Sequence, residues 1–255
     1  MNKNPTTRFS SRVKDYVLYR PGYPSEIIDF LKNKYRLTPQ SIIGDIGSGT
    51  GKSAEMFLQN GNKVYGVEPN EDMRLAAENL FHGNPDFISA NARSEETGLQ
   101  DKSIDFIVAG QAFHWFDPTE TKKEFIRILK PGGNVVLIWN EREPNQTGFM
   151  GEYDGFLYKY STDYKEIDHR NINETKIALF FSPGIFDEQH FDYSQVFDFE
   201  GLKGRYDSAS YAIPSSDPGY REAIEVLIGI FEKYEEDGRV VMKYVTKVFC
   251  GDFGE

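Results

Sequence analysis

The sequence predicts an α/β protein with a doubly wound, seven-stranded and mostly parallel sheet and a helical insertion that forms a cap. Short apolar runs alternate with helical stretches from residue 26 to residue 140. These runs are apolar throughout rather than at every second position, which is typical of parallel strands covered on both faces. Because crossovers between parallel strands are right-handed, a doubly wound sheet is the simplest topology for this order of elements.

The first 140 residues supply most of the predicted elements. Ser25 and Asn70 occupy N-cap positions before helices, and Gly61 stands where the second helix should end. The helices that the apolar spacing predicts cover 26–36, 52–60, 70–81 and 118–130. The strands that the apolar runs predict cover 41–47, 63–69, 86–91, 103–110 and 132–140.

Beyond residue 140 the pattern changes to aromatic-rich segments with weak periodicity. We interpret residues 141–190 as a helical insertion that caps the carboxyl edge of the sheet. Because the sequence shows no internal repeat and no linker, residues 1–255 are expected to form a single domain. The remaining predicted elements are helices at 148–164 and 173–181, a strand and a short helix within 190–213, a helix at 218–240 and a strand at 241–251.

The composition excludes several classes of protein. The 255-residue chain has a net charge of −11, which argues against a nucleic-acid partner because phosphate binding depends on clustered Lys and Arg. No apolar run is long enough for a membrane span or a signal peptide, so we expect a soluble, cytoplasmic protein without a membrane partner. The single cysteine, Cys250, excludes an internal disulfide, and the four scattered histidines give no expectation of a metal site.

The strongest local signal is the segment "GDIGSGTG" at 44–51, between the first strand and its helix. Gly47, Gly49 and Gly51 allow a tight turn and a close approach of the backbone to a ligand. The spacing is GxGxG, and the third glycine of a GxGxxG fingerprint would fall on Lys52. This departure argues against a dinucleotide site, because the missing glycine is the one for tight packing of helix and strand.

Two acids accompany the glycine loop. Asp45 directly precedes it, where its carboxylate could meet a ligand ammonium. Glu68 ends the second strand, where an acid can accept hydrogen bonds from both hydroxyls of a ribose. An acid at a strand end is usually only solvated, but the ordered combination with the glycine loop indicates a nucleoside site.

The fourth strand ends in "VAGQAFHWFDP" at 108–118, a mixture of polar and aromatic residues. In a doubly wound sheet this end lies beside the first strand, at the edge where the topology switches and ligands bind. His114 and Trp115 are therefore expected at the wall of a pocket. A packed aromatic turn without a chemical role is the alternative interpretation of His114.

Four motifs, "DIGSGTG", "VYGVEPN", "AGQAFHWFD" and "RILKPGGNVVLIWNE", resemble the successive motifs of class I S-adenosylmethionine-dependent methyltransferases. More narrowly, they resemble the small-molecule, type 11 group that includes trans-aconitate methyltransferase-like enzymes. The segment "YRPGYPSEIIDFL" is similar to the amino-terminal part of that group. The resemblance covers most of 8–140, whereas 141–255 matches mainly in layout.

The resemblance implies S-adenosylmethionine as cofactor, S-adenosylhomocysteine as product, and an amino-terminal segment at 1–24 that covers the site. Arg20 is placed to meet the cofactor carboxylate or an anionic substrate. The family's polar residue after the third strand is replaced here by "SANARSEE", from which we favour Arg93 and Ser94 as adenine contacts. The implied cofactor residues are Tyr19, Arg20, Asp45, Gly47, Ser48, Gly49, Gly51, Glu68, Pro69, Arg93, Ser94, Ala109, Gly110 and Gln111. The implied substrate-pocket residues are Tyr16, His114 and Trp115.

The expected reaction is in-line methyl transfer to a small-molecule acceptor, by a monomer or a homodimer. A carboxylate acceptor needs no base at neutral pH, whereas a hydroxyl does, and His114 is the candidate catalytic base. Two alternatives remain open, an NAD(P)-dependent oxidoreductase and a non-catalytic cofactor-binding protein. The GxGxG spacing and the absence of a Tyr-x-x-x-Lys motif after the fourth strand count against the oxidoreductase.

Overall fold

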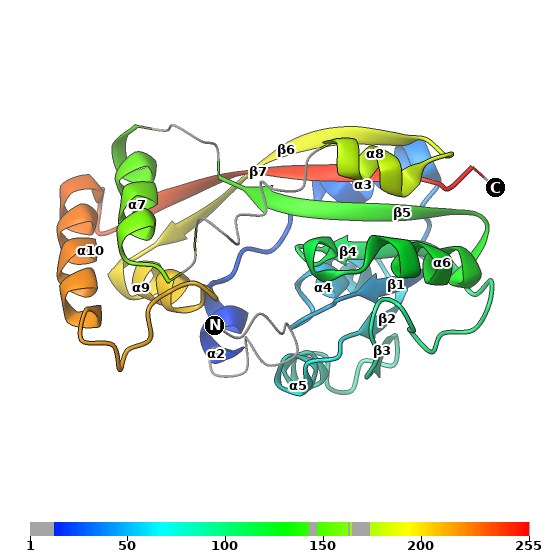
Figure 1. The fold of residues 1–255 in the computed structure, drawn as a ribbon, viewed down its shortest axis with the longest axis horizontal. Helices are drawn as coiled ribbons and strands as arrows, with labels where there is room; N and C mark the ends of the chain where they lie inside the picture. Colours follow the sequence, from blue (N-terminus) through cyan, green and yellow to red (C-terminus); the bar gives the residue numbers. More distant parts are fainter. Residues whose placement is uncertain (1–12, 143–146, 163, 165–173, 255) are drawn as a thin grey trace.

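The structure, a computed structural model, describes residues 13–142, 147–162, 164 and 174–254 (Figure 1). Its strands are β1 (Ile42–Ile46), β2 (Lys63–Val67), β3 (Phe87–Ala90), β4 (Ile104–Gly110), β5 (Leu129–Glu141), β6 (Phe186–Phe197) and β7 (Val240–Gly251). They form one seven-stranded sheet in the order β3-β2-β1-β4-β5-β7-β6. The first five strands pair in parallel, and β7 is antiparallel to both its neighbours. The predicted doubly wound, mostly parallel sheet is confirmed.

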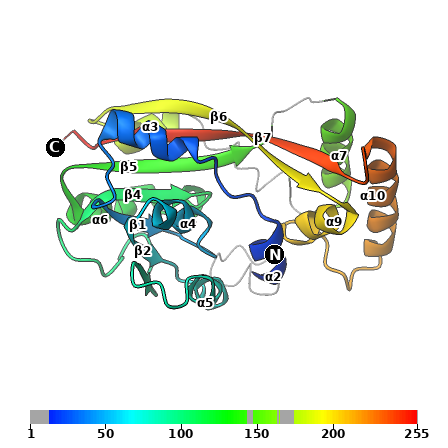
Figure 2. The ribbon, with the colours of Figure 1, turned by 180° about the vertical axis from the view of Figure 1, so that it is seen from behind.

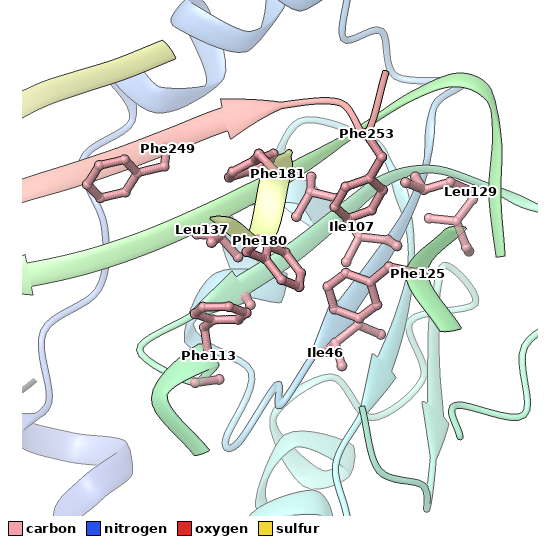
Figure 3. Close-up of a cluster of buried hydrophobic side chains, with 14 of the residues drawn as sticks. Ile46, Ile107, Phe113, Phe125, Leu129, Leu137, Phe180, Phe181, Phe249 and Phe253 are labelled. Carbon is pink, nitrogen blue, oxygen red and sulfur yellow. The ribbon is translucent and has the colours of Figure 1, made fainter. Parts of the chain in front are cut away.

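Helices cover both faces of this sheet (Figures 1 and 2). On one face, α3 and α4 pack against the strands, and on the other face α6 and α8 do so. Figure 3 shows the second of these interfaces, where phenylalanines from α6, α8 and β7 interlock over β4 and β5. The helices are α2 (Val13–Tyr19), α3 (Glu26–Tyr35), α4 (Lys52–Gln59), α5 (Glu71–Leu80), α6 (Pro118–Ile128), α7 (Gly148–Lys159), α8 (Glu174–Phe181), α9 (Phe199–Asp207) and α10 (Tyr220–Tyr234), with a 3-10 turn, η2 (Phe113–Trp115).

The three predicted capping residues lie at the ends of their helices, as expected. The Asn70 side chain accepts a hydrogen bond of 3.0 Å from the Met73 backbone N–H at the start of α5. Gly61 adopts a φ of +88°, the left-handed conformation that ends α4. Ser25 was expected to cap α3, but its hydroxyl donates to the neighbouring Glu26 carboxylate and makes no cap bond. Ser25 is thus the N-cap residue of α3, as predicted, but it forms no side-chain cap bond, because its backbone is helical (φ −62°, ψ −24°) where a capping residue is usually extended.

The segment interpreted as a helical insertion, 141–190, contributes to two different parts of the molecule. α7 packs with α9 and α10 against the distal halves of β6 and β7 (Figure 1). α8 instead lies on the sheet face, because Ile177, Phe180 and Phe181 are buried there against α6. β6 begins at Phe186, four residues before the predicted strand. Residues 143–146, 163 and 165–173 of this segment, and 1–12 of the cover segment, lie outside the described residues.

None of the helices in the described part of the chain has both the length and the apolar character that crossing a bilayer requires.

Candidate active site

A cavity of about 360 Å³ opens at the carboxyl ends of β1, β2 and β4, between the sheet and the helices α2 and α9. In doubly wound sheets this edge is where ligands bind. One part of the cavity lining comes from the loops after these strands and from the amino-terminal segment that the sequence indicates as cover. The predicted residues among them are Tyr16, Arg20, Gly47, Ser48, Gly49, Glu68, Pro69, Arg93, Ser94, Gly110, Gln111, His114 and Trp115.

The loop after β1 needs glycine for two different reasons. Gly47 has a φ of +70°, and a β-carbon there would lie 2.6 Å from the Ala112 β-carbon. Gly49 has a φ of +55°, but its nearest neighbour would be the Met73 side chain at 3.7 Å. Gly47 is therefore required for packing against the loop after β4, whereas Gly49 leaves open space on the cavity side of the backbone.

This difference predicts unequal effects of two matched substitutions. Gly47→Ala should lower the free energy of unfolding by about 2 kcal/mol more than Gly49→Ala, because both strain a left-handed backbone but only Gly47→Ala overlaps a neighbour. Urea unfolding followed by circular dichroism measures both values. Equal losses for the two variants would contradict the packing role of Gly47.

The Glu68 carboxylate stands at the end of β2 and is fixed by the backbone. One of its oxygens accepts a hydrogen bond of 2.9 Å from the Gly49 N–H, and the other accepts one of 2.8 Å from the Asn70 N–H. Its burial raises its pKa, and the two N–H donors and Arg74 only partly oppose this shift. Each oxygen keeps a further lone pair, so the carboxylate can accept two more hydrogen bonds from a ligand in the cavity.

Asp45 lies behind the wall of the cavity instead of on it. Its side chain is fully buried and accepts hydrogen bonds of 2.8 Å from the hydroxyl of Ser53, which does line the cavity. Burial, and to a lesser extent the charge of Glu68, raise the pKa of Asp45 to about 7, against the hydrogen bonds from Ser53 and the Ala54 backbone. The structure therefore places Ser53, and not the Asp45 carboxylate, at the surface of the cavity.

The polar and aromatic cluster after β4 forms a wall of the cavity. Gln111 has a φ of +54°, which a residue other than glycine rarely adopts, and its amide donates to the Asn140 carbonyl at 3.0 Å. Asn140 in turn donates to the Gly22 carbonyl at 2.8 Å, which ties the amino-terminal segment to β5. His114 and Trp115 follow in η2 with their rings 4.9 Å apart, and both line the cavity.

Besides Asp45, three predicted cofactor residues do not line the cavity. Tyr19 packs against α9, where a β-carbon on Gly204 would lie 2.1 Å from its ring. Gly51 caps the start of α4 and makes room for the ring of Phe81. Ala109 is fully buried inside β4. These three residues belong to the framework around the cavity and are not among its lining residues.

The cavity also has a wall that the sequence did not indicate. It comes from the end of β5, from the segment around α9 and from β7, which are far apart along the chain. No short-range sequence pattern predicts that these segments meet. Arg142 and Arg205, in the aromatic-rich part of the chain, are only a weak signal for a site. The residues of this wall are Asn140, Arg142, Tyr164, Arg205, Ser210, Tyr211 and Tyr244. Among the described residues, no group of three or more His, Cys, Asp or Glu is arranged to hold a metal ion.

Comparison with known proteins identifies the half of the chain that carries the glycine loop. Residues 44–137 match the family model of a methyltransferase domain. An uncharacterized methyltransferase of Mycobacterium tuberculosis is 35% identical over 135 residues, which is 53% of each chain. A probable S-adenosylmethionine-dependent methyltransferase of Saccharomyces cerevisiae is 27% identical over 166 residues, 63% of this chain and 56% of that one. This chain spans about half the length of the curated relatives that it matches.

Solved structures match the fold over most of the chain. A candidate type II methyltransferase from Anaeromyxobacter dehalogenans superposes with a TM-score of 0.62 at 19% identity, covering 92% of this chain and 99% of that one. The phosphoethanolamine N-methyltransferase 2 of Haemonchus contortus, in complex with S-adenosyl-L-methionine, gives a TM-score of 0.56 at 14% identity, over 96% and 57% of the two chains. Residues 44–137 therefore match a methyltransferase domain in sequence, and the described chain shares the fold of solved methyltransferase structures.

Proposed function

We propose that this protein transfers a methyl group from S-adenosylmethionine to a small-molecule acceptor. The observation that carries the proposal is the Glu68 carboxylate, which two backbone N–H groups hold beside an open glycine loop. A ribose diol needs an acceptor of this kind at the end of the second strand of such a sheet. The methyltransferase match of residues 44–137 supports the same reaction.

The residues around the cavity fit this cofactor. Glu68 would bind the ribose hydroxyls, and Arg93 and Ser94 line the cavity where the adenine is expected. Gly110 and Gln111 are proposed to contact the methionine half, with Asp45 acting on its ammonium through Ser53. When bound, S-adenosylmethionine supplies an electrophilic methyl group on a sulfonium.

The chain itself positions the acceptor and excludes water. Orientation of two reactants in a closed site supplies on the order of 7–11 kcal/mol of such a barrier. His114 and Trp115 line the cavity next to Gln111, and Tyr16 lines it from α2 in the amino-terminal segment. We propose a carboxylate or a hydroxyl as the methylated group, with His114 taking the proton only when the group is a hydroxyl.

Replacing His114 by alanine tests its role directly. Turnover of a hydroxyl acceptor should fall by about 100-fold, whereas a carboxylate acceptor should lose less than about tenfold, because it is already ionised. Affinity for S-adenosylhomocysteine should stay within about threefold of wild type in both cases. Release of S-adenosylhomocysteine gives the rates, and His82→Ala on the surface is the matched control. A parallel loss of cofactor affinity would contradict an acceptor-side role.

Titration calorimetry with S-adenosylmethionine, S-adenosylhomocysteine and NAD tests the proposal as a whole. We expect the first two to bind and NAD not to bind. Binding of NAD alone would support a Rossmann oxidoreductase, and binding of the methyl donor without turnover across an acceptor panel would support a non-catalytic cofactor-binding protein. A panel of small carboxylic acids and alcohols, monitored by release of S-adenosylhomocysteine, then identifies the acceptor.

A further inference from the structure

Three arginines from separate segments line the cavity: the sequence indicated Arg20, whereas Arg142 and Arg205 lie on the wall that it did not indicate. Arg20 directly follows α2, Arg142 directly follows β5, and Arg205 lies on α9. α2 packs against α9 (Figure 1), and the absence of a side chain at Gly204 allows the Tyr19 ring to approach closely. This close approach places Arg20 and Arg205 on the same wall.

Arg205 is the most deeply buried of the three, with 4% of its surface exposed. Its Nε donates to the Tyr244 hydroxyl at 3.2 Å. Its Nη1 is buried and has no hydrogen-bond partner among the described residues. Because a buried guanidinium that lacks partners is costly, this nitrogen indicates a ligand that supplies an acceptor.

Arg142 has a partner that only partly compensates its charge. Its side chain is 12% exposed, and one Nη donates to the Tyr164 hydroxyl at 2.6 Å. The Asp154 carboxylate lies 3.7 Å from that same nitrogen and itself accepts a hydrogen bond from Tyr164. The Nε of Arg142 is buried and has no hydrogen-bond partner among the described residues.

Arg20 completes the cluster with neutral partners. It donates to the Ser208 carbonyl at 3.1 Å, and its guanidinium lies 5.0 Å from the centre of the Tyr16 ring. Its Nε is also buried without a hydrogen-bond partner among the described residues. Burial, and then the positive charge of Arg205, lower the pKa of Arg20, which shows that the cationic groups are crowded together.

The charges of this wall do not balance within the described chain. Asp154 is the one described carboxylate within 4 Å of the three guanidinium groups, so two of the three positive charges lack a counterion there. The positive charges of the three arginines also act on Tyr211, which lines the cavity. Burial by itself would raise the pKa of Tyr211, but the charges of the three arginines and a hydrogen bond with Arg142 outweigh burial and lower it. The wall therefore favours negative charge.

We propose that Arg20, Arg142 and Arg205 bind a doubly negative acceptor, a small acid that carries two carboxylates or a phosphate. This inference rests on the proposed function, because it assigns the arginine wall to the acceptor. The cofactor alone does not neutralise the three guanidinium groups, since it carries a single carboxylate and two of the groups lack a counterion within the described chain. Planar guanidinium groups from three directions match the spread oxygen atoms of such an acid.

Binding of simple dianions to the protein without cofactor tests the site. The probes are succinate, citrate and inorganic phosphate at equal ionic strength, with succinamide as the uncharged control, followed by calorimetry and thermal unfolding. At least one dianion should bind and raise the unfolding temperature, whereas succinamide should do neither. Preference for citrate and succinate over phosphate assigns the acceptor to the polycarboxylic acids, and the reverse assigns it to the phosphate-bearing acids.

Substitution of the arginines locates the binding. Arg142→Gln and Arg205→Gln should each weaken the preferred dianion roughly 10- to 100-fold, and Arg221→Gln on the exposed face of α10 should leave it unchanged. The ligand-free variants should unfold at the wild-type temperature or above, because each removes a buried charge that lacks a counterion. Affinity for S-adenosylhomocysteine should stay within about threefold of wild type. If one variant does not fold, the other carries the test.

The outcomes separate this inference from the proposed function. Dianions that bind no better than succinamide, or that bind both variants as tightly as wild type, would overturn the arginine site. A large fall in the unfolding temperature of both ligand-free variants would also overturn it, because the guanidinium groups would then be satisfied within the chain. Dianion binding without any binding of S-adenosylhomocysteine would leave the arginine site in place and contradict the methyltransferase proposal.

Discussion

Asp45→Asn is expected to abolish most of the pH dependence of both stability and cofactor binding between pH 5 and pH 8. The Asp45 carboxyl is fully buried, and burial is the main cause that raises its pKa to about 7. An unfolded chain returns this pKa to about 4. The substitution keeps the size of the side chain and one acceptor for the Ser53 hydroxyl, but it removes the ionisation.

The sign of the effect on stability follows from the raised pKa. Between about pH 4 and pH 7 the folded wild-type protein holds a proton on Asp45 that the unfolded chain has lost, so stability falls as pH rises. The stability that the protonated Asp45 contributes is fully present below pH 4, and it is lost once the pH passes the pKa of about 7 in the folded protein. The three-unit difference corresponds to roughly 4 kcal/mol. At pH 8 the ligand-free Asp45→Asn protein should therefore be the more stable of the two.

The affinity for the cofactor should change with pH in the opposite direction to the stability. An ionised Asp45 favours the cofactor ammonium, so wild-type affinity should rise as pH increases through 7, with release of a proton on binding. Asp45→Asn should bind S-adenosylhomocysteine roughly 10- to 100-fold more weakly at pH 8 and release no proton. Calorimetry in buffers of different ionisation enthalpy counts the proton, and urea unfolding at pH 5 and pH 8 measures stability.

An exposed aspartate provides the control for this experiment. Asp86→Asn, just before β3, should retain the wild-type pH dependence of stability and binding. Unchanged proton release in Asp45→Asn, or an equal fall in its stability from pH 5 to pH 8, would show that another group titrates. Glu68 is then the next candidate, because its pKa is also raised by burial.

The parallel half of the fold could be predicted because its physical causes are local. β1 and β4 are buried over most of their length, so they appear as largely apolar runs, and glycine and Asn70 mark where the following helices begin or end. Residues directly after these strands must meet at one edge of the sheet, and this is why Glu68 and His114 could be placed at one cavity. The same reasoning also placed Ala109 at the cavity, but Ala109 still lies inside β4 and is fully buried.

Arg142 and Arg205 could not be predicted as site residues, because their position at the cavity depends on tertiary contacts. Arg142 and Arg205 line the same cavity only because the long strands β6 and β7 position α9 beside it (Figure 2). In the sequence Arg205 follows Gly204 in a short segment with little apolar periodicity, which resembles an ordinary exposed helix. The structure buries this face of α9 against α2 and β7, and no spacing of residues in one segment encodes that contact.

Glu68→Gln is expected to weaken the binding of S-adenosylhomocysteine about 100-fold. The wild-type carboxylate accepts from Gly49 and Asn70 with one lone pair on each oxygen and offers the others to the ribose. Glutamine replaces one of these acceptors by a donor, which cannot meet a backbone N–H and a ribose hydroxyl in the same way. Two hydrogen bonds to a charged acceptor are lost or weakened, at about 1.5–3 kcal/mol each.

A ligand that lacks the ribose hydroxyls shows whether the loss arises from the proposed contact. Wild type should bind adenosine more tightly than 2′,3′-dideoxyadenosine, and Glu68→Gln should bind the two nearly equally, because the coupling between carboxylate and hydroxyls is gone. Glu71→Gln, an exposed residue at the start of α5, should preserve the wild-type preference. If Glu68→Gln kept that preference while binding S-adenosylhomocysteine within threefold of wild type, the ribose would have to lie elsewhere. The nucleoside site at the end of β2 would then be wrong, and with it the observation that carries the methyltransferase proposal.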